Sequence, residues 1–461
     1  MENGAYDLII IGGGAGGVAA AIRARQLGAR TLLLERQDLG GICLNRGCIP
    51  TKTLTEIARL YRSVHQADSF GLKARNVEID WDILLNKKDE LIQYIRLGTE
   101  SLLKSNGVEI LRKEASFGTA HRILVGNRDI DAKCFILATG SIWSPPSIEG
   151  IQQDGVINPD DVLSMKGSLN TIGVLGSGPI ELELAQYLSF LGAKVMLFEE
   201  ADRILAEEDK EVSQRMALVL RDQGLEILRQ TRLLEIQHEK DSSLLLRLSS
   251  KNGESSVKVD RLLHAKRTPC MEMLGLQELG IKSTKGGILI NDSLQTSIPH
   301  IYAIGDVTGS PMYSHRASAM GIVAAERALG TKASIDLRVV PRGYYTTPEI
   351  ASVGMTEQEA IQAGYNCKVG TISYGGNPKA MILQSQRGSV KVVADSKCGQ
   401  ILGVHIVGPH ATELIGEGAL AVKMEATVED LAGSIRYHPS FSESQVDAAR
   451  EVFGRAIYVM R

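Results

Sequence analysis

The sequence predicts an α/β fold built around two Rossmann-like βαβ units. An internal repeat predicts the two units, and the chain length predicts a further domain. Segment 7–35, DLIIIGGGAGGVAAAIRARQLGARTLLLE, aligns without a gap with segment 171–199, TIGVLGSGPIELELAQYLSFLGAKVMLFE. Each copy has an apolar run, a glycine-rich turn, a helical stretch and a second apolar run ending in glutamate, which is typical of a βαβ unit. The 461 residues are enough for about three domains, so we expect a further domain beyond the two units.

The first glycine-rich turn has the pattern of a dinucleotide site. Gly12 would permit the tight turn, Gly14 would let the backbone approach a pyrophosphate, and Gly17 would allow the helix to pack closely. The N–H groups at the start of the helix would face the phosphates, and Glu35 would accept hydrogen bonds from ribose hydroxyls. Glycine spacing alone is a weak signal in a chain with 47 glycines, but the surrounding strand, helix and acid make it specific.

The second unit repeats this pattern with one departure. Gly176, Gly178 and Glu199 match the first unit, whereas Glu181 stands where the third glycine should be. A glutamate rather than an arginine at position 199 favours NAD over NADP. Two interpretations of Glu181 stay open: it adds bulk and charge between helix and strand, or a slightly displaced helix turns it to solvent.

Composition narrows the class of protein. Hydrophobic residues make up 44% and charged residues 23%, which is near the globular average. The formal net charge of -3, from 51 basic and 54 acidic residues, gives no reason to expect a nucleic acid or anionic membrane as partner. The apolar stretch 8–22 is short and rich in glycine, and the N-terminal MENGAYDL has no basic region. We therefore expect no membrane span, no targeting peptide and a cytoplasmic location.

Two of the six cysteines are close together in the segment 40–52, GGICLNRGCIPTK. In a regular helix the rise from Cys43 to Cys48 would be about 7.5 Å, so a bridge between them needs a loop or a distorted turn, for which Gly47 and Pro50 are suitable. Such a short-range disulfide would be strained and reducible, as a catalytic pair requires. The alternatives are unrelated buried thiols or a zinc site, but no further ligands stand at CxxC or HxxxH spacing, so no metal is expected.

The cysteine segment resembles that of a known protein family. The segment 40–52 resembles the redox-disulfide segment of the flavin-dependent pyridine nucleotide-disulfide oxidoreductases, and its CLNxGCIP wording is most similar to their dihydrolipoyl dehydrogenase group. Other family motifs follow in order along nearly the whole chain: the crossover CFILATGSIWSPP (134–146), the second flavin motif TSIPHIYAIGDV (296–307), and the dimerisation-domain segments YTTPEIASVGMTE (345–357) and GVHIVGPHATELI (403–415).

The resemblance implies a domain order and an assembly. It places the first part of an FAD-binding domain, with the redox disulfide, at residues 1–148 and an NAD-binding-like domain at 149–270. The FAD-binding domain would resume at 271–340, and an α+β dimerisation domain would occupy 341–461. It also implies a homodimer in which the C-terminal domain lends a histidine to the disulfide of the other subunit.

The resemblance further implies roles around the disulfide. Cys43 would be the interchange thiol that meets the substrate, and Cys48 the thiol next to the flavin. Lys52 would lie near the flavin and pair with Glu183 of the second βαβ unit. An ammonium there would favour electron density arriving on the flavin, and its carboxylate partner would balance the charge.

Further site residues follow from the other motifs. In RYHPSFSESQVDAA, His438 would be the acid–base group for a dithiol substrate and Glu443 would orient it. Thr139 and Gly140 of the crossover motif and Asp306 of the second flavin motif would contact FAD.

The implied activity is the oxidation of protein-bound dihydrolipoyl groups, or of a small dithiol, through a Cys43–Cys48 disulfide and FAD to NAD. The NAD-binding half departs from the family a second time in LLHAKRTPCMEMLGL (262–276), where Lys266 replaces a glycine and Cys270 an asparagine. Lys266 either obstructs the nucleotide or turns outward. Together with Glu181, it motivates the hypothesis of weak or altered NAD(H) binding.

Several other functions would share parts of this pattern. A same-fold disulfide reductase, such as glutathione, mercuric or thioredoxin reductase, or an enzyme with a different electron acceptor, would share the cysteine pair. The C-terminal FGRAIYVMR has no cysteine pair, which argues against mercuric and long-tailed thioredoxin reductases, and Glu199 argues against an NADPH-dependent glutathione reductase. A redox-sensing flavoprotein without turnover would not need Cys43, Cys48, His438 and Glu443 together.

Overall fold

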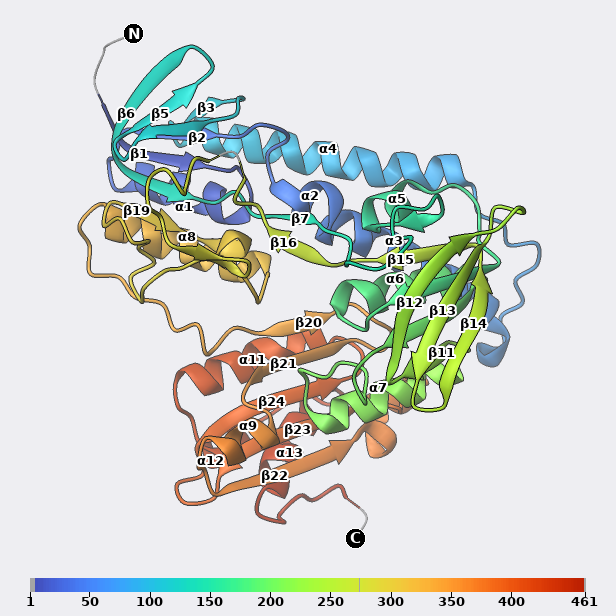
Figure 1. Ribbon diagram of the computed structural model, residues 1–461. Helices are drawn as coiled ribbons and strands as arrows, with labels where there is room; N and C mark the ends of the chain where they lie inside the picture. Colours follow the sequence, from blue (N-terminus) through green and yellow to red (C-terminus); the bar gives the residue numbers. More distant parts are fainter. Residues whose placement is uncertain (1–4, 273, 460–461) are drawn as a thin grey trace.

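The computed structural model of the protein describes residues 5–272 and 274–459. It has the mixed α/β architecture that the repeat predicts (Figure 1). Each βαβ unit lies in a run of parallel strands, the first sheet also has an antiparallel edge, and an antiparallel sheet follows. The first βαβ unit and α8 (Ser314–Ala328) lie together, and the C-terminal sheet, which begins with β20 (Arg342–Tyr344), forms a separate region. No helix within the described residues is long and apolar enough to cross a membrane.

The first sheet contains the first βαβ unit and is parallel around it. Strand β1 (Tyr6–Ile11) lies between β2 (Thr31–Leu34) and β6 (Arg128–Leu137), and β19 (Ile301–Ala303) pairs with the far side of β6. Helices cover such a sheet on both faces, which is why β1 is a continuous apolar run rather than an alternating one. The remaining elements of this part are α1 (Ala15–Gln26), α2 (Gly41–Arg46), α3 (Cys48–His65), η1 (Ala67–Phe70), α4 (Trp81–Ser105), β3 (Glu109–Leu111), β4 (Ser116–Thr119), β5 (Arg122–Val125), β7 (Ser141–Trp143), β16 (Arg267–Pro269), β17 (Ser283–Thr284), β18 (Gly287–Ile288), η2 (Gly305–Thr308) and α8 (Ser314–Ala328).

The second parallel sheet contains the second βαβ unit. Its strand order is β11-β10-β9-β15-β8, and a separate antiparallel sheet, β12-β13-β14, packs beside it. Because all its strands are parallel, their carboxyl ends meet at one edge. The elements are β8 (Val156–Ile157), α5 (Pro159–Ser164), β9 (Thr171–Leu175), α6 (Pro179–Phe190), β10 (Lys194–Glu199), α7 (Lys210–Asp222), β11 (Glu226–Arg229), β12 (Thr231–His238), β13 (Leu244–Ser250), β14 (Gly253–Val259) and β15 (Arg261–His264).

The C-terminal region is an antiparallel sheet with helices packed against it. The strand order is β20-β21-β24-β23-β22, and β23 and β24 are almost wholly buried. The elements are β20 (Arg342–Tyr344), β21 (Ile350–Gly354), α9 (Glu357–Gln362), β22 (Cys367–Ser373), η3 (Tyr374–Gly376), α10 (Pro378–Ile382), β23 (Ser389–Asp395), β24 (Ile401–Val407), α11 (Ala411–Lys423), α12 (Val428–Ala432) and α13 (Glu443–Glu451).

Helix α6 is the element that joins the three regions. It begins with Pro179, whose fixed φ suits the first helical position, and the residues from Leu182 to Leu188 are all buried. Two of these residues are polar and are satisfied from outside the helix. Glu183 contacts Lys52 of α3, and Gln186 accepts a hydrogen bond from the Thr347 N–H at 2.7 Å. The helix is therefore fixed to both neighbouring regions by buried polar contacts.

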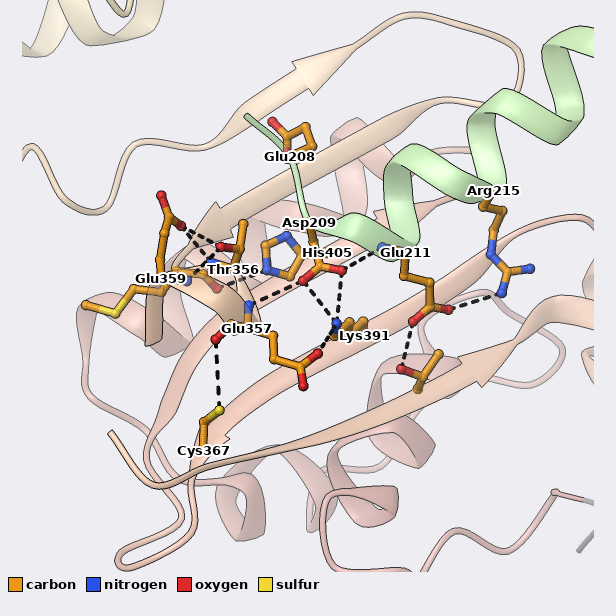
Figure 2. Close-up of polar contacts among 12 residues, drawn as sticks. Glu208, Asp209, Glu211, Arg215, Thr356, Glu357, Glu359, Cys367, Lys391 and His405 are labelled. Atoms are coloured by element: carbon orange, nitrogen blue, oxygen red, sulfur yellow. Dashed lines mark hydrogen bonds and ion pairs between the residues drawn. The ribbon is translucent and has the colours of Figure 1, made fainter. Parts of the chain in front are cut away.

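A second buried polar cluster fixes the start of α7 to the C-terminal sheet (Figure 2). Lys391 of β23 donates to the two carboxylate oxygens of Asp209 at 2.9 and 3.0 Å and to Glu357 at 2.7 Å. Asp209, with a side chain only 2% exposed, also caps α7 by accepting from the Glu211 N–H. His405 lies directly opposite Lys391 on β24. A buried carboxylate is tolerated here because it has both a cation and a backbone donor.

Removing one partner of this cluster should destabilise the protein. In Lys391→Met the buried Asp209 carboxylate loses its cation. Removing one partner of a buried ion pair typically lowers the free energy of unfolding by about 3–5 kcal/mol. The midpoint of thermal unfolding should therefore fall by several degrees. Lys166→Met is the matched control, because Lys166 and Asp82 form an exposed pair worth only about 0–1 kcal/mol. Equal midpoints for the two variants would contradict this account of the cluster.

Candidate functional site

The turn between β1 and α1 leaves no room for side chains. Gly12 has a φ of 113°, and a Cβ there would collide with the carbonyl oxygen of Ala138. A Cβ at Gly17 would collide with the carbonyl oxygen of Gly12. Gly14 precedes α1 and no side chain caps this helix, so the N–H groups of its first turn are available to an anion. The turn fits the pyrophosphate of a dinucleotide.

An acid and a second loop stand beside this turn. Glu35 accepts hydrogen bonds from the N–H groups of Gly13 and Gln37, both at 2.7 Å, which fix its carboxylate next to the turn. Thr139 and Gly140 follow β6 at the same edge of the sheet, where the Thr139 hydroxyl donates to the Cys270 carbonyl at 2.6 Å. The parallel strands bring these residues to one edge.

Asp306 reaches the same edge from β19. Its Oδ2 accepts from the Ser141 hydroxyl at 2.7 Å and from Arg267 at 2.9 Å. The glycine turn, the uncapped helix and the flanking carboxylates are the groups that an FAD molecule would need, so the residues predicted for FAD fit that cofactor.

The cysteine pair lies where two helices meet. Cys43 is in α2, Cys48 is the first residue of α3, and Gly47 separates the helices. Pro50 lies in the first turn of α3, where its missing N–H is tolerated, so the break is at Gly47. Both cysteines are free thiols in the structure, and the two are hydrogen-bonded to each other. Cys48 therefore begins a new helix directly beside the one that carries Cys43.

The surroundings shift the pKa values of the two thiols in opposite directions. The hydrogen bond from Cys43, and then the charge of Lys52, lower the pKa of Cys48 although burial opposes them. The same hydrogen bond, followed by burial, raises the pKa of Cys43. The Ser314 hydroxyl, 3.7 Å from the Cys48 sulfur, also favours the Cys48 thiolate. Cys48 is thus the sulfur that holds negative charge when the pair is reduced.

Lys52 lies one helical turn after Cys48 and contacts the second βαβ unit. Its Nζ is 2.5 Å from Oε2 of Glu183, a side chain that is 2% exposed. Burial alone would lower the pKa of Lys52, but the charge and hydrogen bond of Glu183 outweigh it and raise the pKa. The Tyr345 N–H donates to the other Glu183 oxygen at 2.8 Å, and the Tyr345 ring centroid is 4.8 Å from Nζ.

His438 and Glu443 form a pair in the C-terminal region. Nδ1 of His438 is 2.9 Å from Oε1 of Glu443, whose Oε2 accepts from the Ser440 N–H at 2.8 Å. A carboxylate on Nδ1 orients the ring and leaves Nε2 to exchange a proton. The His438 side chain is 67% exposed, and within the described residues no hydrogen bond or ion pair joins it to Cys43 or Cys48.

The second unit forms a cavity at the carboxyl ends of its strands. The volume is about 310 Å³ and the predicted residues Gly176, Glu199 and Lys266 line it together with Glu181. Glu199 accepts from the Ser177 hydroxyl at 2.5 Å and from the Ala201 N–H at 2.8 Å, much as Glu35 does in the first unit. The structure therefore brings both departures from the family pattern into one cavity.

Lys266 and Glu181, the two departures from the family pattern, occupy different parts of this cavity. Lys266 is exposed at its rim. The Glu181 side chain folds back over the glycine turn, with Oε2 2.7 Å from the place that a Cβ on Gly178 would take. Glu181 is half-buried, and its carboxylate points over the glycine turn into the cavity. The parallel strand ends and Glu199 fit NAD, whereas the Glu181 carboxylate opposes its diphosphate.

Two residues near the cysteines were not predicted to act there. Ser314 contacts Cys48 across 266 positions of the sequence, and no pattern connects the two segments. Tyr345 begins the YTTPEIASVGMTE motif, but nothing in that motif indicates that its amide reaches Glu183. Only the packed fold brings these residues to the cysteines.

Known proteins of one family match this chain over almost its full length. The family description pyridine nucleotide-disulphide oxidoreductase matches residues 6–321, and the dimerisation domain of that family matches residues 340–449. A dihydrolipoyl dehydrogenase of Thermus scotoductus is 39% identical over 460 residues, which are 99% of each chain. One of Bacillus subtilis is 35% identical over 477 residues, covering 98% of this chain and 99% of the relative.

A solved structure of a flavoprotein disulfide reductase has a similar fold. The chain resembles the HOCl-induced flavoprotein disulfide reductase RclA from Escherichia coli, solved as a Cu(II) complex, with a TM-score of 0.85 and 28% sequence identity. The similarity covers 95% of this chain and 98% of that one.

Removing the charge of Lys52 should raise the pKa of Cys48. The double variant Lys52→Met, Glu183→Gln removes both charges together, so no buried charge is left unpaired. We expect the pH midpoint for alkylation of Cys48 by iodoacetamide in the reduced protein, followed by mass spectrometry, to rise by up to about 1 unit. The rise remains because the charge of Lys52 lowers this pKa more than the charge of Glu183 raises it. The control is Arg59→Met, Glu56→Gln, an exposed pair on the same helix. An unshifted midpoint in the first variant would contradict the assignment.

Proposed function

The chain belongs to the pyridine nucleotide-disulphide oxidoreductase family, and from this we propose that it oxidises dihydrolipoyl groups and passes the electrons to NAD. As a member it is a flavin-dependent disulfide oxidoreductase, an enzyme whose family uses FAD and NAD. The observation that carries the proposal is the Cys43–Cys48 pair, placed beside the buried Lys52–Glu183 ion pair.

The choice of a lipoyl substrate is supported by the relatives. Proteins named dihydrolipoyl dehydrogenase match this chain over almost their full length. A dihydrolipoyl group carries two thiols that close into a cyclic disulfide, which is the change that a neighbouring cysteine pair accepts by thiol–disulfide exchange. The partner we propose is therefore a lipoyl-carrying protein or a small dithiol.

The exchange begins with the oxidised pair. A substrate thiolate attacks the Cys43 sulfur, the Cys43–Cys48 bond breaks, and Cys48 leaves as a thiolate that the charge of Lys52 stabilises. The second substrate thiol gives its proton to His438 and attacks the substrate sulfur of the mixed disulfide. A cyclic disulfide forms and Cys43 leaves with a proton from the histidine. Two electrons have then passed from the substrate to the cysteine pair.

The remaining residues hold the cofactors and balance charge. We assign Gly12, Gly14, Gly17 and Glu35 to the FAD turn, with Thr139, Gly140 and Asp306 at the same edge. FAD and NAD supply, when bound, the removal of these two electrons. Lys52 places a positive charge close to the thiolate, and Glu183 keeps that charge paired in its buried position.

The histidine comes from a second copy of the chain in this proposal. The chain has the dimerisation domain of the family, and Ile435 and Tyr437 next to His438 are 97% and 82% exposed. Exposed apolar side chains around a catalytic pair fit a surface that another subunit covers. The partner subunit's His438 would then face Cys43, with the partner subunit's Glu443 orienting it.

The division of the chain and its location complete the proposal. We assign residues 1–148 and 271–340 to FAD binding, 149–270 to NAD binding and 341–461 to the interface. We place the enzyme in the reducing cytoplasm, where a close cysteine pair is more often catalytic than structural.

The function is tested by reducing the flavin with a dithiol. Anaerobic stopped-flow mixing with dihydrolipoamide should bleach the flavin absorbance of the wild type, and Cys48→Ser should slow this by at least about 10³-fold. Cys398→Ser, which changes an exposed cysteine, should behave like the wild type. Unchanged reduction in Cys48→Ser would refute the mechanism. Turnover with NADPH and glutathione disulfide but not with dihydrolipoamide would refute the substrate.

A further inference from the structure

The two βαβ units differ in the donors that their helices offer to a phosphate. In α1 the first intrahelical bond is donated by Val18, so the N–H groups of Ala15, Gly16 and Gly17 are not used within the helix. In α6 the first such bond is donated by Leu182, which leaves only the N–H groups of Ile180 and Glu181. Pro179, at the first helical position, has no N–H to give.

The Glu181 carboxylate competes with a ligand for these two donors, because its own backbone N–H favours its charged form. The same carboxylate fills the hollow of the glycine turn, 2.7 Å from a Cβ position on Gly178 and 3.9 Å from one on Gly176. In the first unit the corresponding place is open, because Gly17 has no side chain. An internal anion thus lies where the turn and helix would receive a diphosphate.

The charges around Glu181 do not neutralise it. Burial is the largest cause that raises its pKa, to about 7, and the charges of Glu199 and Glu183 act in the same direction. Its own amide and Arg267 oppose them. The other ionisable groups lining the cavity are Glu200, His264 and Lys266; burial lowers the pKa of His264, and Lys266 and Glu200 are exposed.

We propose that Glu181 is an affinity-determining residue of this cavity: its carboxylate stands at the diphosphate position, and a dinucleotide binds well only when that carboxylate is uncharged or absent. The inference rests on the proposed NAD-binding role of the cavity. It makes nucleotide binding in this chain dependent on pH near neutrality, whereas a glycine at the same position would leave binding insensitive to pH.

The sign of the pH effect follows from the protonation state. Below about pH 7 Glu181 is mostly protonated and does not repel a diphosphate. Above it, the competent fraction of the protein falls and the apparent Kd rises in proportion. For a single group titrating near this value, the Kd should increase about tenfold between about pH 6 and about pH 8.

Calorimetric titration of the oxidised holoenzyme with NAD+ tests this directly, because oxidised enzyme and NAD+ do not react. The wild type should show the tenfold rise in Kd, while Glu181→Gln and Glu181→Gly should bind with a Kd that is nearly constant across this range. At the higher pH both variants should bind more tightly than the wild type. Glu200→Gln removes another acid of the same cavity and should keep the pH dependence of the wild type.

The other outcomes distinguish failure of the Glu181 role from failure of the NAD site. A flat wild-type Kd, or the same pH dependence in Glu181→Gln as in the wild type, would overturn the role of Glu181 while leaving the NAD site intact. If neither the wild type nor Glu181→Gly binds NAD+ at either pH, the NAD-binding role of the cavity fails and this inference fails with it. Flavin reduction by dihydrolipoamide does not use this cavity, so it reports on the dithiol reaction separately.

Discussion

The buried ion pair between Lys52 and Glu183 is the contact on which the rest of the structure depends. Lys52 belongs to the helix that starts with Cys48, Glu183 belongs to the second βαβ unit, and Tyr345 of the link to the C-terminal sheet donates to the same carboxylate. An unpaired buried charge is costly, so the three regions are held in one arrangement. The same ammonium stabilises the Cys48 thiolate, so the fold and the chemistry rely on one charge.

The two βαβ units offer a diphosphate different sets of donors. Both have a glycine turn, an uncapped helix and a glutamate fixed by local donors. The first keeps three unused N–H groups and an open hollow, as tight binding of a diphosphate requires. The second has a proline and a glutamate at the start of its helix, and both reduce what the helix offers. A tightly held cofactor and a nucleotide that has to leave after each turnover place different demands on these two sites.

The sequence alone predicted much of this arrangement, for physical reasons that particular residues illustrate. The βαβ units are local: strand, turn and helix follow each other, so the repeat and the glycines at 12, 14, 17, 176 and 178 indicate them directly. The contact of Ser314 with Cys48 and the direction of the Glu181 side chain depend on segments distant in the chain or on rotamers. The antiparallel β12-β13-β14 sheet was not predicted, although its strands have seven or eight residues, because no glycine-rich turn or family motif marks this segment.

The central claim is that the cysteine pair of one subunit works with the histidine of the other. Mixed dimers of a Cys48→Ser chain and a His438→Ala chain test it most directly, with dihydrolipoamide oxidation as the measurement. Each homodimer should be nearly inactive, and the mixed dimer should regain about half of the wild-type activity, since one of its two sites has both groups intact. A mixed dimer as inactive as its parents would contradict the claim, because that result requires the cysteines and the histidine to act within one chain.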